Sequence, residues 1–498
     1  MKDTVKKKEI IVLTAVFALW LFFNGILLAG HELWRDEANV WLLARELSPL
    51  QLLREIKYQG HPCLWYFIVM PFAKLGLPFK TLSVISFLIM SVSAGIFVYR
   101  APFCCITKAV CLISPVFSYY YPVVARNYCL IALLMILLAV FHPKRNDRPV
   151  IYGILLGLLV QSDTIVLAAA GLISLMWLAE SIVKSIKEKS GSVILQAVKG
   201  LWIPLASLLL WILQFYQVSD SPEYHPQILS FTDMMHEIRN FSYSILTRMT
   251  GQGQFFDLLL ILLFMAAGIL ISLSIKNFWP MIVMAGAFLF EVIFSIMIYQ
   301  LHIWHYIAIC FVLIWFFWVG SRKEGGLALC GRILSEGLLI LLSVTMFMRW
   351  NSPEESSSLE NALKGLYSDG ENAAAYIEEN IPGKELILST DVAEASTVAA
   401  YLGRSYVFYY AGNLKPTSYA DYSNEQSSTV SYEELLQKIR REFPDKKCFY
   451  ILICPDNCIK DIPDEVKESW EICYQTQEET ARGENYKLCR VELDSVHK

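Results

Sequence analysis

The chain has 498 residues, of which 55% are hydrophobic and 18% are charged, and its formal net charge at pH 7 is −4. A soluble chain usually carries about 25% charged residues. This composition excludes a disordered protein, a soluble enzyme with ordinary surface chemistry and a nucleic-acid-binding protein with a basic face. It indicates a protein that lies in a lipid bilayer.

The charges divide the chain into two parts near residue 350. Residues 351–498 contain 15 Lys and Arg against 27 Asp and Glu, whereas residues 1–350 contain 27 against 19. We therefore predict two domains, an apolar transmembrane domain over 1–350 and an acidic, water-soluble domain over 351–498.

Eleven apolar runs are long enough, some of them marginally, to cross a bilayer as helices. They are Ile10–Ala29, Leu82–Tyr99, Phe103–Tyr121, Tyr128–Phe141, Val150–Val160, Thr164–Ile182, Gly200–Tyr216, Phe256–Ile275, Trp279–Tyr299, Ile303–Val319 and Ile333–Met348. A shorter run, Cys63–Pro78, is interrupted by Pro71, Lys74 and Gly76. We interpret it as a juxtamembrane or re-entrant segment.

The positions of Lys and Arg indicate the orientation, because cytoplasmic loops carry an excess of positive charge. With eleven spans and a cytoplasmic N-terminus, the cytoplasmic segments hold 17 Lys and Arg in 58 residues, and the opposite loops hold 9 in 103. A twelfth span at Cys63–Pro78 would reverse most of this bias. We therefore predict a multi-pass cell-membrane protein with an uncleaved N-terminal signal anchor and an extracytoplasmic C-terminal domain.

The acidic C-terminal part alternates between patterns typical of helices and of strands. We expect helices at Glu371–Asn380 and Tyr432–Phe443, and strands at Glu385–Ser389, Ser405–Tyr410, Lys447–Cys454, Trp470–Gln475 and Tyr486–Leu493. This order predicts a small α/β domain. It contains no glycine-rich phosphate-binding motif and no nucleophile elbow, so its sequence predicts no function of its own.

The first extracytoplasmic loop, residues 30–81, contains the chemically informative residues. Asp36 and Glu37 closely follow the first span, where the dielectric is low and the desolvation of a carboxylate is costly. Carboxylates in such places are usually paired or functional. About twenty residues later, Gly60 and Pro62 turn the chain back toward the membrane and place His61 near the interface. The alternative interpretation is an amphipathic surface loop with solvated charges.

Three short motifs follow one another in the chain: W-R-D-E-A at 34–38, G-H-P-x-L-W-Y at 60–66 and A-R-N-Y-x-L at 125–130. Their order and spacing resemble the integral-membrane glycosyltransferases of the GT-C fold, in the family 39-like branch that contains protein O-mannosyltransferases and the lipid A aminoarabinose transferase. The resemblance covers roughly residues 10–350. Two departures concern the second motif, where Cys63 replaces a second Pro and His61 replaces the basic residue that some relatives carry.

This resemblance implies a mainly α, polytopic GT-C enzyme that transfers a sugar from a polyprenyl-phosphate donor to an acceptor on the extracytoplasmic face, with inversion. The acidic residue of the family maps onto Asp36, which would act as the general base, since one carboxylate near the acceptor hydroxyl suffices. Glu37 would orient Asp36 or help to bind donor or acceptor. The sequence does not identify the sugar, hexosyl or pentosyl, or the acceptor, which is a protein, a glycolipid or a wall polymer.

The leaving lipid phosphate requires positive charge or strong hydrogen-bond donors. Arg126 is the only basic residue of its short outside connection and is a candidate for this role, together with His61 and Tyr128. The structural alternatives are snorkelling or interfacial anchoring for Arg126 and an aromatic-belt position for Tyr128.

Three further residues are predicted to bind substrate at the same face. Asp163 is expected to bind sugar hydroxyls, unless it is only a helix-boundary carboxylate. His302 and His305 share a helical face at the spacing i, i+3 and are expected to contact phosphate or a metal, unless they are ordinary interfacial histidines. No other spacing suggests metal ligands, so we predict no metal and no cofactor. The loop Val218–Phe255, with Glu223, His225, Arg239 and Arg248, is expected to cover the acceptor groove.

Two other functions remain open from the sequence. A transporter or flippase would need charges or broken helices near the midplane and internal repeats, and Glu291 is the only clear charge within a span. A catalytically inactive assembly protein would function mainly through its C-terminal part.

Overall fold

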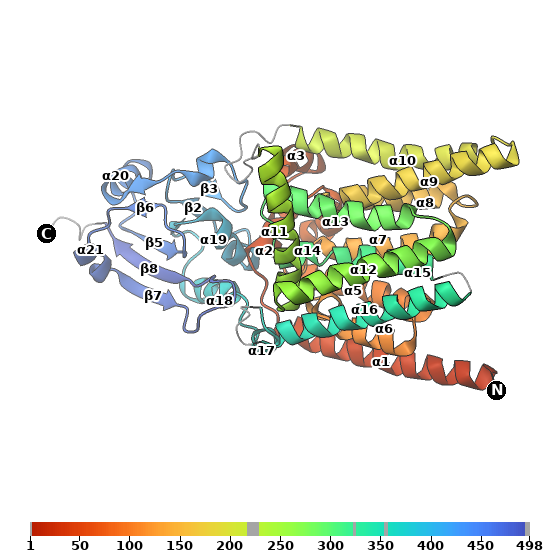
Figure 1. Ribbon diagram of the computed structural model, residues 1–498. Coiled ribbons are helices and arrows are strands. Elements are labelled where there is room, and N and C mark those ends of the chain that lie inside the picture. The colour runs from red at the N-terminus through yellow and green to blue at the C-terminus, as the bar shows by residue number, and fades with distance from the viewer. Residues whose placement is uncertain (1, 217–228, 322–324, 353–356, 494–498) are drawn as a thin grey trace.

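The computed structural model describes residues 2–216, 229–321, 325–352 and 357–493. It shows a bundle of helices with a mixed α/β domain against one end, while the N-terminus lies at the opposite end of the bundle (Figure 1). We call residues 357–493 the C-terminal domain. The order of elements agrees with the predicted mainly α membrane protein carrying a small α/β domain.

Helices occupy every predicted span. They are α1 (Lys2–Gly30), α5 (Thr81–Arg100), α6 (Cys105–Ile113) with the π-helical turn η2 (Val116–Tyr120), α7 (Tyr128–Phe141), α8 (Pro149–Val160), α9 (Leu167–Glu188), α10 (Ser192–Phe215), α12 (Gln254–Ile275), α13 (Trp279–Met297), α14 (Ile303–Tyr306) with α15 (Ile309–Gly320), and α16 (Gly326–Trp350). Within the described residues, eight helical segments are long and apolar enough to cross a membrane. The others, in α6, α7 and α8, are shorter, and α4 (Leu64–Lys74), inside the predicted re-entrant segment, has only 11 residues.

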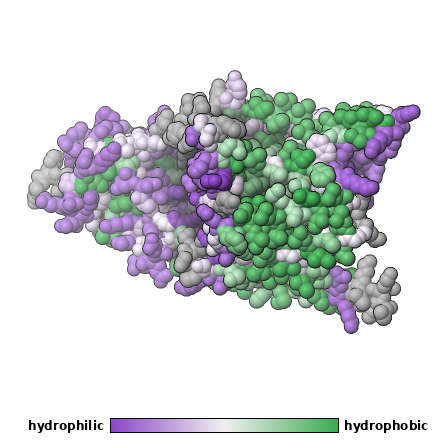
Figure 2. All heavy atoms as spheres, in the orientation of Figure 1, coloured by the Kyte–Doolittle hydropathy of each residue, from purple (hydrophilic) through white to green (hydrophobic). Residues whose placement is uncertain are grey.

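A broad apolar surface covers the visible face of the bundle between two polar ends (Figure 2). Large hydrophobic side chains point outward there: Leu19, Phe22 and Leu213 are each exposed by two thirds or more. Such exposure is unfavourable in water and favourable in hydrocarbon, so this surface has the properties of a lipid-facing belt.

The C-terminal domain contains a six-stranded sheet in the order β3-β2-β1-β5-β8-β7. Its strands are β1 (Ile387–Ser389), β2 (Phe408–Tyr410), β3 (Pro416–Thr417), β5 (Cys448–Ile453), β7 (Glu471–Gln475) and β8 (Lys487–Glu492). β1 runs parallel to β2 and β5, and the other pairs are antiparallel. The domain also contains β4 (Val430–Ser431), β6 (Ile459–Lys460), α17 (Leu359–Lys364), α18 (Gly370–Asn380), α19 (Val392–Tyr401), α20 (Tyr432–Glu442) and α21 (Asp464–Ser469). The five predicted strands and two predicted helices are therefore present, whereas α19 was not predicted.

The segment 30–81, predicted as the first outside loop, lies between the bundle and the C-terminal domain. Its helix α2 (Arg35–Glu46) packs against both α4 and α19. Asn39 of α2 forms a paired contact with the backbone of Ala420, whose N–H donates to Asn39 Oδ1 at 2.8 Å and whose carbonyl accepts from Asn39 Nδ2 at 3.2 Å. The N–H of Leu33 donates to the hydroxyl of Tyr401. These buried polar contacts fix the loop against residues more than 350 positions away.

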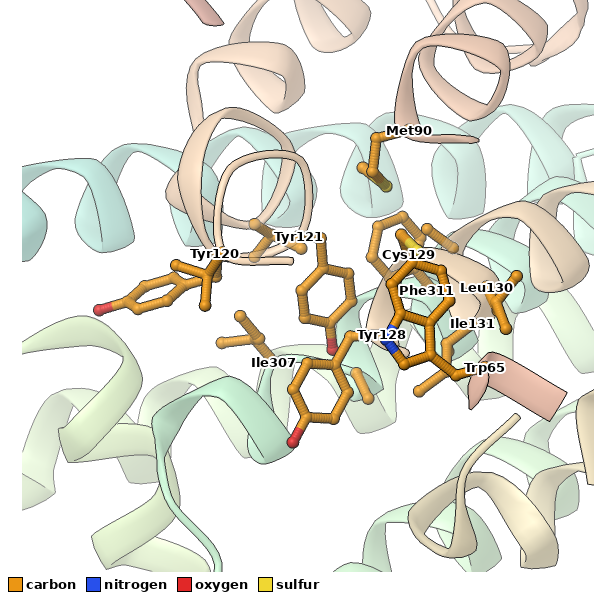
Figure 3. Close-up of a cluster of buried hydrophobic side chains, with 14 of the residues drawn as sticks. Trp65, Met90, Tyr120, Tyr121, Tyr128, Cys129, Leu130, Ile131, Ile307 and Phe311 are labelled. Atoms are coloured by element: carbon orange, nitrogen blue, oxygen red, sulfur yellow. The ribbon is translucent and has the colours of Figure 1, made fainter. Parts of the chain in front are cut away.

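An aromatic cluster lies buried within the bundle (Figure 3). Tyr121 stacks on Tyr128 and on Phe311, with ring centroids 5.4 and 5.5 Å apart, and Trp65 from α4 packs into the same cluster. All four side chains are almost completely inaccessible to solvent. Close-packed aromatic rings resist displacement, so the residues that adjoin them on the neighbouring segments are held in place.

Helices α8 and α10 approach each other through two glycines. A Cβ atom on Gly153 would lie 2.2 Å from the backbone oxygen of Gly200. We expect Gly153→Ala to force these helices apart and to lower the free energy of unfolding by about 1–3 kcal/mol, the usual cost of overpacking. The matched control is Gly171→Ala in α9, where the added Cβ meets nothing within 4 Å. Thermal unfolding in detergent should show a lower midpoint for the first variant alone, and equal midpoints would contradict the packing described.

Candidate functional site

A cavity of about 530 Å³ lies where the bundle, the segment 30–81 and the C-terminal domain meet. Six of the eight predicted site residues line it: Asp36, His61, Arg126, Asp163, His302 and His305. They come from five separate segments of the chain, since His302 and His305 share the short turn around α14, so only the folded chain brings them together.

Four of these side chains form a continuous chain of charged and polar groups. Arg126 Nη1 donates to Asp36 Oδ2, and Arg126 Nη2 lies 2.7 Å from His61 Nε2. On the other side of the imidazole ring, His61 Nδ1 lies 3.1 Å from Asp163 Oδ2. Asp163 also accepts a hydrogen bond of 2.6 Å from Asn127 Nδ2. Arg126 therefore connects two carboxylates, one directly and one through His61.

The partners of His61 define its tautomer. A guanidinium can only donate hydrogen bonds, so His61 Nε2 must accept from Arg126. Nδ1, the other ring nitrogen, then carries a proton and faces the carboxylate of Asp163. His61 therefore lies between the guanidinium of Arg126 and the carboxylate of Asp163.

Asp36 lies in the first turn of α2, where the helix dipole favours a negative charge. Burial alone would raise the pKa of Asp36, but Arg126, and after it Arg35, holds this pKa below its ordinary value. The side chain is still 23% exposed. Asp36 is therefore an ionised carboxylate at the surface of the cavity.

Glu37 has a different position from its neighbour, because its side chain is fully buried and lies outside the cavity lining. Its carboxylate accepts hydrogen bonds from the backbone N–H of Ala125 at 2.5 Å and of Trp34 at 3.1 Å, and lies 3.1 Å from His31 Nε2. Since Ala125 precedes Arg126, Glu37 holds the segment that carries Arg126 against the start of α2. The predicted roles of Glu37, orienting Asp36 or binding donor or acceptor, remain predictions, and the structure places its carboxylate outside the cavity lining.

Tyr128 also lies outside the cavity lining. Its ring belongs to the aromatic cluster of Figure 3 and meets the rings of His61 and His305 edge-on, at centroid distances of 6.0 and 5.6 Å. The predicted contact between Tyr128 and substrate is therefore replaced by support for two histidines that do line the cavity.

His302 and His305 both line the cavity, and His305 Nδ1 accepts a hydrogen bond of 3.0 Å from the backbone N–H of His302. The ring of His302 stacks on Trp304, with centroids 4.7 Å apart. Burial lowers the pKa of His302, and the cations of Arg482, Arg248 and Arg35 lower it further, while Asp36 acts in the opposite direction. Within the described residues, no group of three or more His, Cys, Asp and Glu side chains is arranged to hold a metal.

Several lining residues were not predicted from the sequence as members of the site. Arg35, Arg349 and Arg482 line the cavity, and Arg482 comes from the C-terminal domain. Arg248 belongs to α11 (Phe231–Thr250), in the loop predicted to cover the groove. In that loop Arg239 does not line the cavity, while Glu223 and His225 lie outside the described residues. No local motif distinguishes Arg482, because its place in the site depends on contacts distant in sequence.

We expect Glu37→Gln to destabilise the protein by about 1–3 kcal/mol, because one buried carboxylate oxygen that accepts a backbone hydrogen bond would be replaced by an amide group that donates. Glu46→Gln at the end of α2 is the matched control, since Glu46 is 30% exposed and its pair with Arg45 lies near the surface. The measurement is the thermal unfolding midpoint of each variant in detergent. A Glu37 variant that unfolds like the wild type would show that this clamp contributes nothing.

Comparisons with known proteins give a consistent result for the fold. No family profile and no curated protein sequence match the chain. Among solved structures, ArnT from Cupriavidus metallidurans bound to undecaprenyl phosphate aligns with a TM-score of 0.52 at 11% identity, over 97% of each chain. The same protein in the apo state aligns with a TM-score of 0.54 at 12% identity, over 98% of each chain. The alignments include both the bundle and the C-terminal domain, and they confirm the fold that the motifs predicted: the chain has the GT-C fold of these aminoarabinose transferase structures.

Proposed function

We propose that this protein transfers a sugar from a polyprenyl-phosphate donor to an acceptor at the extracytoplasmic face of the membrane, with inversion at the anomeric carbon. The observation that carries the proposal is the ionised carboxylate of Asp36 in a cavity between the apolar belt and the polar C-terminal domain. The shared fold supports it, since one of the two similar structures is described as bound to undecaprenyl phosphate.

Asp36 acts as the general base in this proposal. The acceptor hydroxyl oxygen attacks the anomeric carbon, its proton passes to Asp36, and the bond between that carbon and the phosphate oxygen breaks, with the electron pair leaving on the polyprenyl phosphate. Arg126 occupies Asp36 Oδ2, and among the described residues none donates a hydrogen bond to Oδ1. Oδ1 is thus the oxygen assigned to the acceptor proton.

Arg126 and His61 maintain this base in its ionised form. A carboxylate as buried as Asp36 would otherwise take up a proton, and the guanidinium prevents this by direct contact. Asp163, fixed by Ile165 N–H at 2.9 Å and by Asn127, holds His61 in the tautomer that accepts from Arg126. In this proposal Asp163 also binds sugar hydroxyls at the cavity wall, as the sequence predicted.

The position of the cavity agrees with a substrate that is part lipid and part sugar. The predicted orientation, with a cytoplasmic N-terminus and an extracytoplasmic C-terminal domain, places the cavity at the outer surface of the membrane. A transporter would instead use charges deep in the bundle, and Glu291 of α13 is buried there without lining the cavity. The acceptor, whether protein, glycolipid or wall polymer, approaches from the side of the C-terminal domain in this arrangement.

Replacing Asp36 tests the proposed base. We expect Asp36→Asn to reduce sugar transfer by about 10²–10⁴-fold, the usual contribution of a general base, with little change in folding. Membranes containing wild type or variant would be incubated with a panel of labelled polyprenyl-phosphate sugars, and the label followed into acceptors. Asp464→Asn is the control, because that carboxylate is 92% exposed on the C-terminal domain. Full transfer by the Asp36 variant would remove Asp36 as the base.

The pH dependence tests the role of Arg126. Because the pKa of Asp36 lies below its ordinary value, the wild-type rate should not fall with acidification until the pH is below that value. In Arg126→Met, burial becomes the main influence on the pKa of Asp36, so this pKa should rise. The pH at which the transfer rate falls on acidification should then be higher than in the wild type. Arg441→Met, at a guanidinium 74% exposed on the C-terminal domain, should leave the profile unchanged. An unchanged acid limb in the Arg126 variant would contradict this role.

A further inference from the structure

Arg482 extends from the C-terminal domain into the cavity. It lies in the connection between β7 and β8, which is fixed by backbone hydrogen bonds from Ala481 N–H to the Leu366 carbonyl at 2.7 Å and from Arg482 N–H to the Tyr367 carbonyl at 3.3 Å. Its side chain lines the cavity beside residues of the membrane bundle. Residues of both the bundle and the C-terminal domain therefore form the cavity wall.

The guanidinium of Arg482 is held among aromatic rings. Its Cζ lies 4.4 Å from the ring centroid of Trp304, 4.6 Å from that of Trp34 and 4.9 Å from that of Tyr367. Nε and Nη2 both donate to the hydroxyl of Tyr367, at 2.8 and 2.6 Å. These contacts orient the planar group and favour its charge without neutralising it.

The charge of Arg482 is less compensated than the charges of Arg126 and Arg35, which line the same cavity. Arg126 is paired with Asp36, and Arg35 lies 3.5 Å from Glu394. By contrast, no carboxylate oxygen of the described residues lies within 4 Å of the Arg482 guanidinium nitrogens, and Nη1 has no protein acceptor among those residues. A preorganised guanidinium with a free donor edge, in a cavity of limited solvent access, is suited to an anion.

Arg126 is poorly placed to bind such an anion. Its Nη1 and Nη2 are already used by Asp36 and His61, and a phosphate that displaced Asp36 would remove the contact that keeps the proposed base ionised. The two tasks, maintaining the base and receiving the leaving phosphate, are therefore better performed by different arginines. His302 lines the same cavity, and its pKa is influenced by both Asp36 and Arg482, so Arg482 lies within electrostatic reach of the residues around the proposed base.

We propose that Arg482 of the C-terminal domain binds the phosphate of the polyprenyl lipid through Nη1, so that the C-terminal domain supplies part of the substrate site. This inference rests on the proposed function and refines it: Arg126 becomes a positioning residue for Asp36, and Arg482 becomes a ligand of the leaving group. The shared chemistry is a phosphate monoester or diester, and the lipid-linked form is the occupant to which we commit.

Binding of undecaprenyl phosphate to the purified full-length protein in detergent tests this assignment. We expect Arg482→Met, which preserves apolar packing against Trp34 and Trp304, to weaken binding by at least about tenfold, as expected for the loss of a hydrogen bond to a charged group. Arg482→Lys should bind several-fold more weakly than wild type, because a point charge lacks the planar fork. Undecaprenol, which lacks the phosphate, should bind all three proteins equally. Arg490→Met, on the sheet of the C-terminal domain, is the control.

If the Arg482 variants fail to fold, a measurement on the wild-type protein still tests the assignment. Phenylglyoxal modification of Arg482, followed by peptide mass spectrometry, should be slowed by undecaprenyl phosphate and not by undecaprenol. Inorganic phosphate should protect only at much higher concentration, and equal protection by free phosphate would show that the site takes a phosphate without its lipid.

These experiments distinguish failure of the proposed function from failure of the Arg482 assignment alone. A wild-type protein that binds no undecaprenyl phosphate would count against the proposed donor, and thereby against the function and this inference together. Tight binding that is unchanged in Arg482→Met, or unchanged reactivity of Arg482 with the lipid bound, would overturn the role of Arg482 alone.

Discussion

The ion pair between Arg126 and Asp36 is the interaction on which the site depends. Two opposite charges removed from water are costly unless each is closely paired and further hydrogen-bonded. The surrounding structure meets this condition: Glu37 fixes the backbone just before Arg126, and Asp163 fixes His61 on the other side of the guanidinium. The aromatic cluster below then prevents these segments from separating. The same contacts therefore pack this region and hold its charged groups in position.

Much of this arrangement was predictable because its signals are local. Apolar runs located the spans, and charge bias separated the C-terminal domain. The motifs around Asp36, His61 and Arg126 indicated the residues that the structure unites. The sequence assigned Asp36 as the base but left two roles open for Glu37. The side-chain position of Glu37 was not predictable, because adjacent helical residues point in different directions and only the fold determines which one meets the cavity.

Arg482 shows the limit of sequence reasoning. It lies in a polar connection of an acidic domain whose sequence indicates no function, and its importance arises from Trp34 and Trp304, which are distant in the chain. The helix α19 was missed for a related reason: its run of Val, Ala, Ser and Thr has no strong helical pattern, and it is stabilised by packing against α2. Tertiary contacts, rather than local preference, determine both features.

The connection that carries Arg482 also carries Glu484, whose carboxylate accepts a hydrogen bond of 2.9 Å from the backbone N–H of Arg35, at the start of α2. These two partners are separated by almost the whole length of the polypeptide. A ribosome therefore releases the residues that complete the cavity long after the first helix has been made. Premature termination even a few residues before position 482 would leave a bundle with an unfinished pocket, so the cavity can form only after this connection has been synthesised.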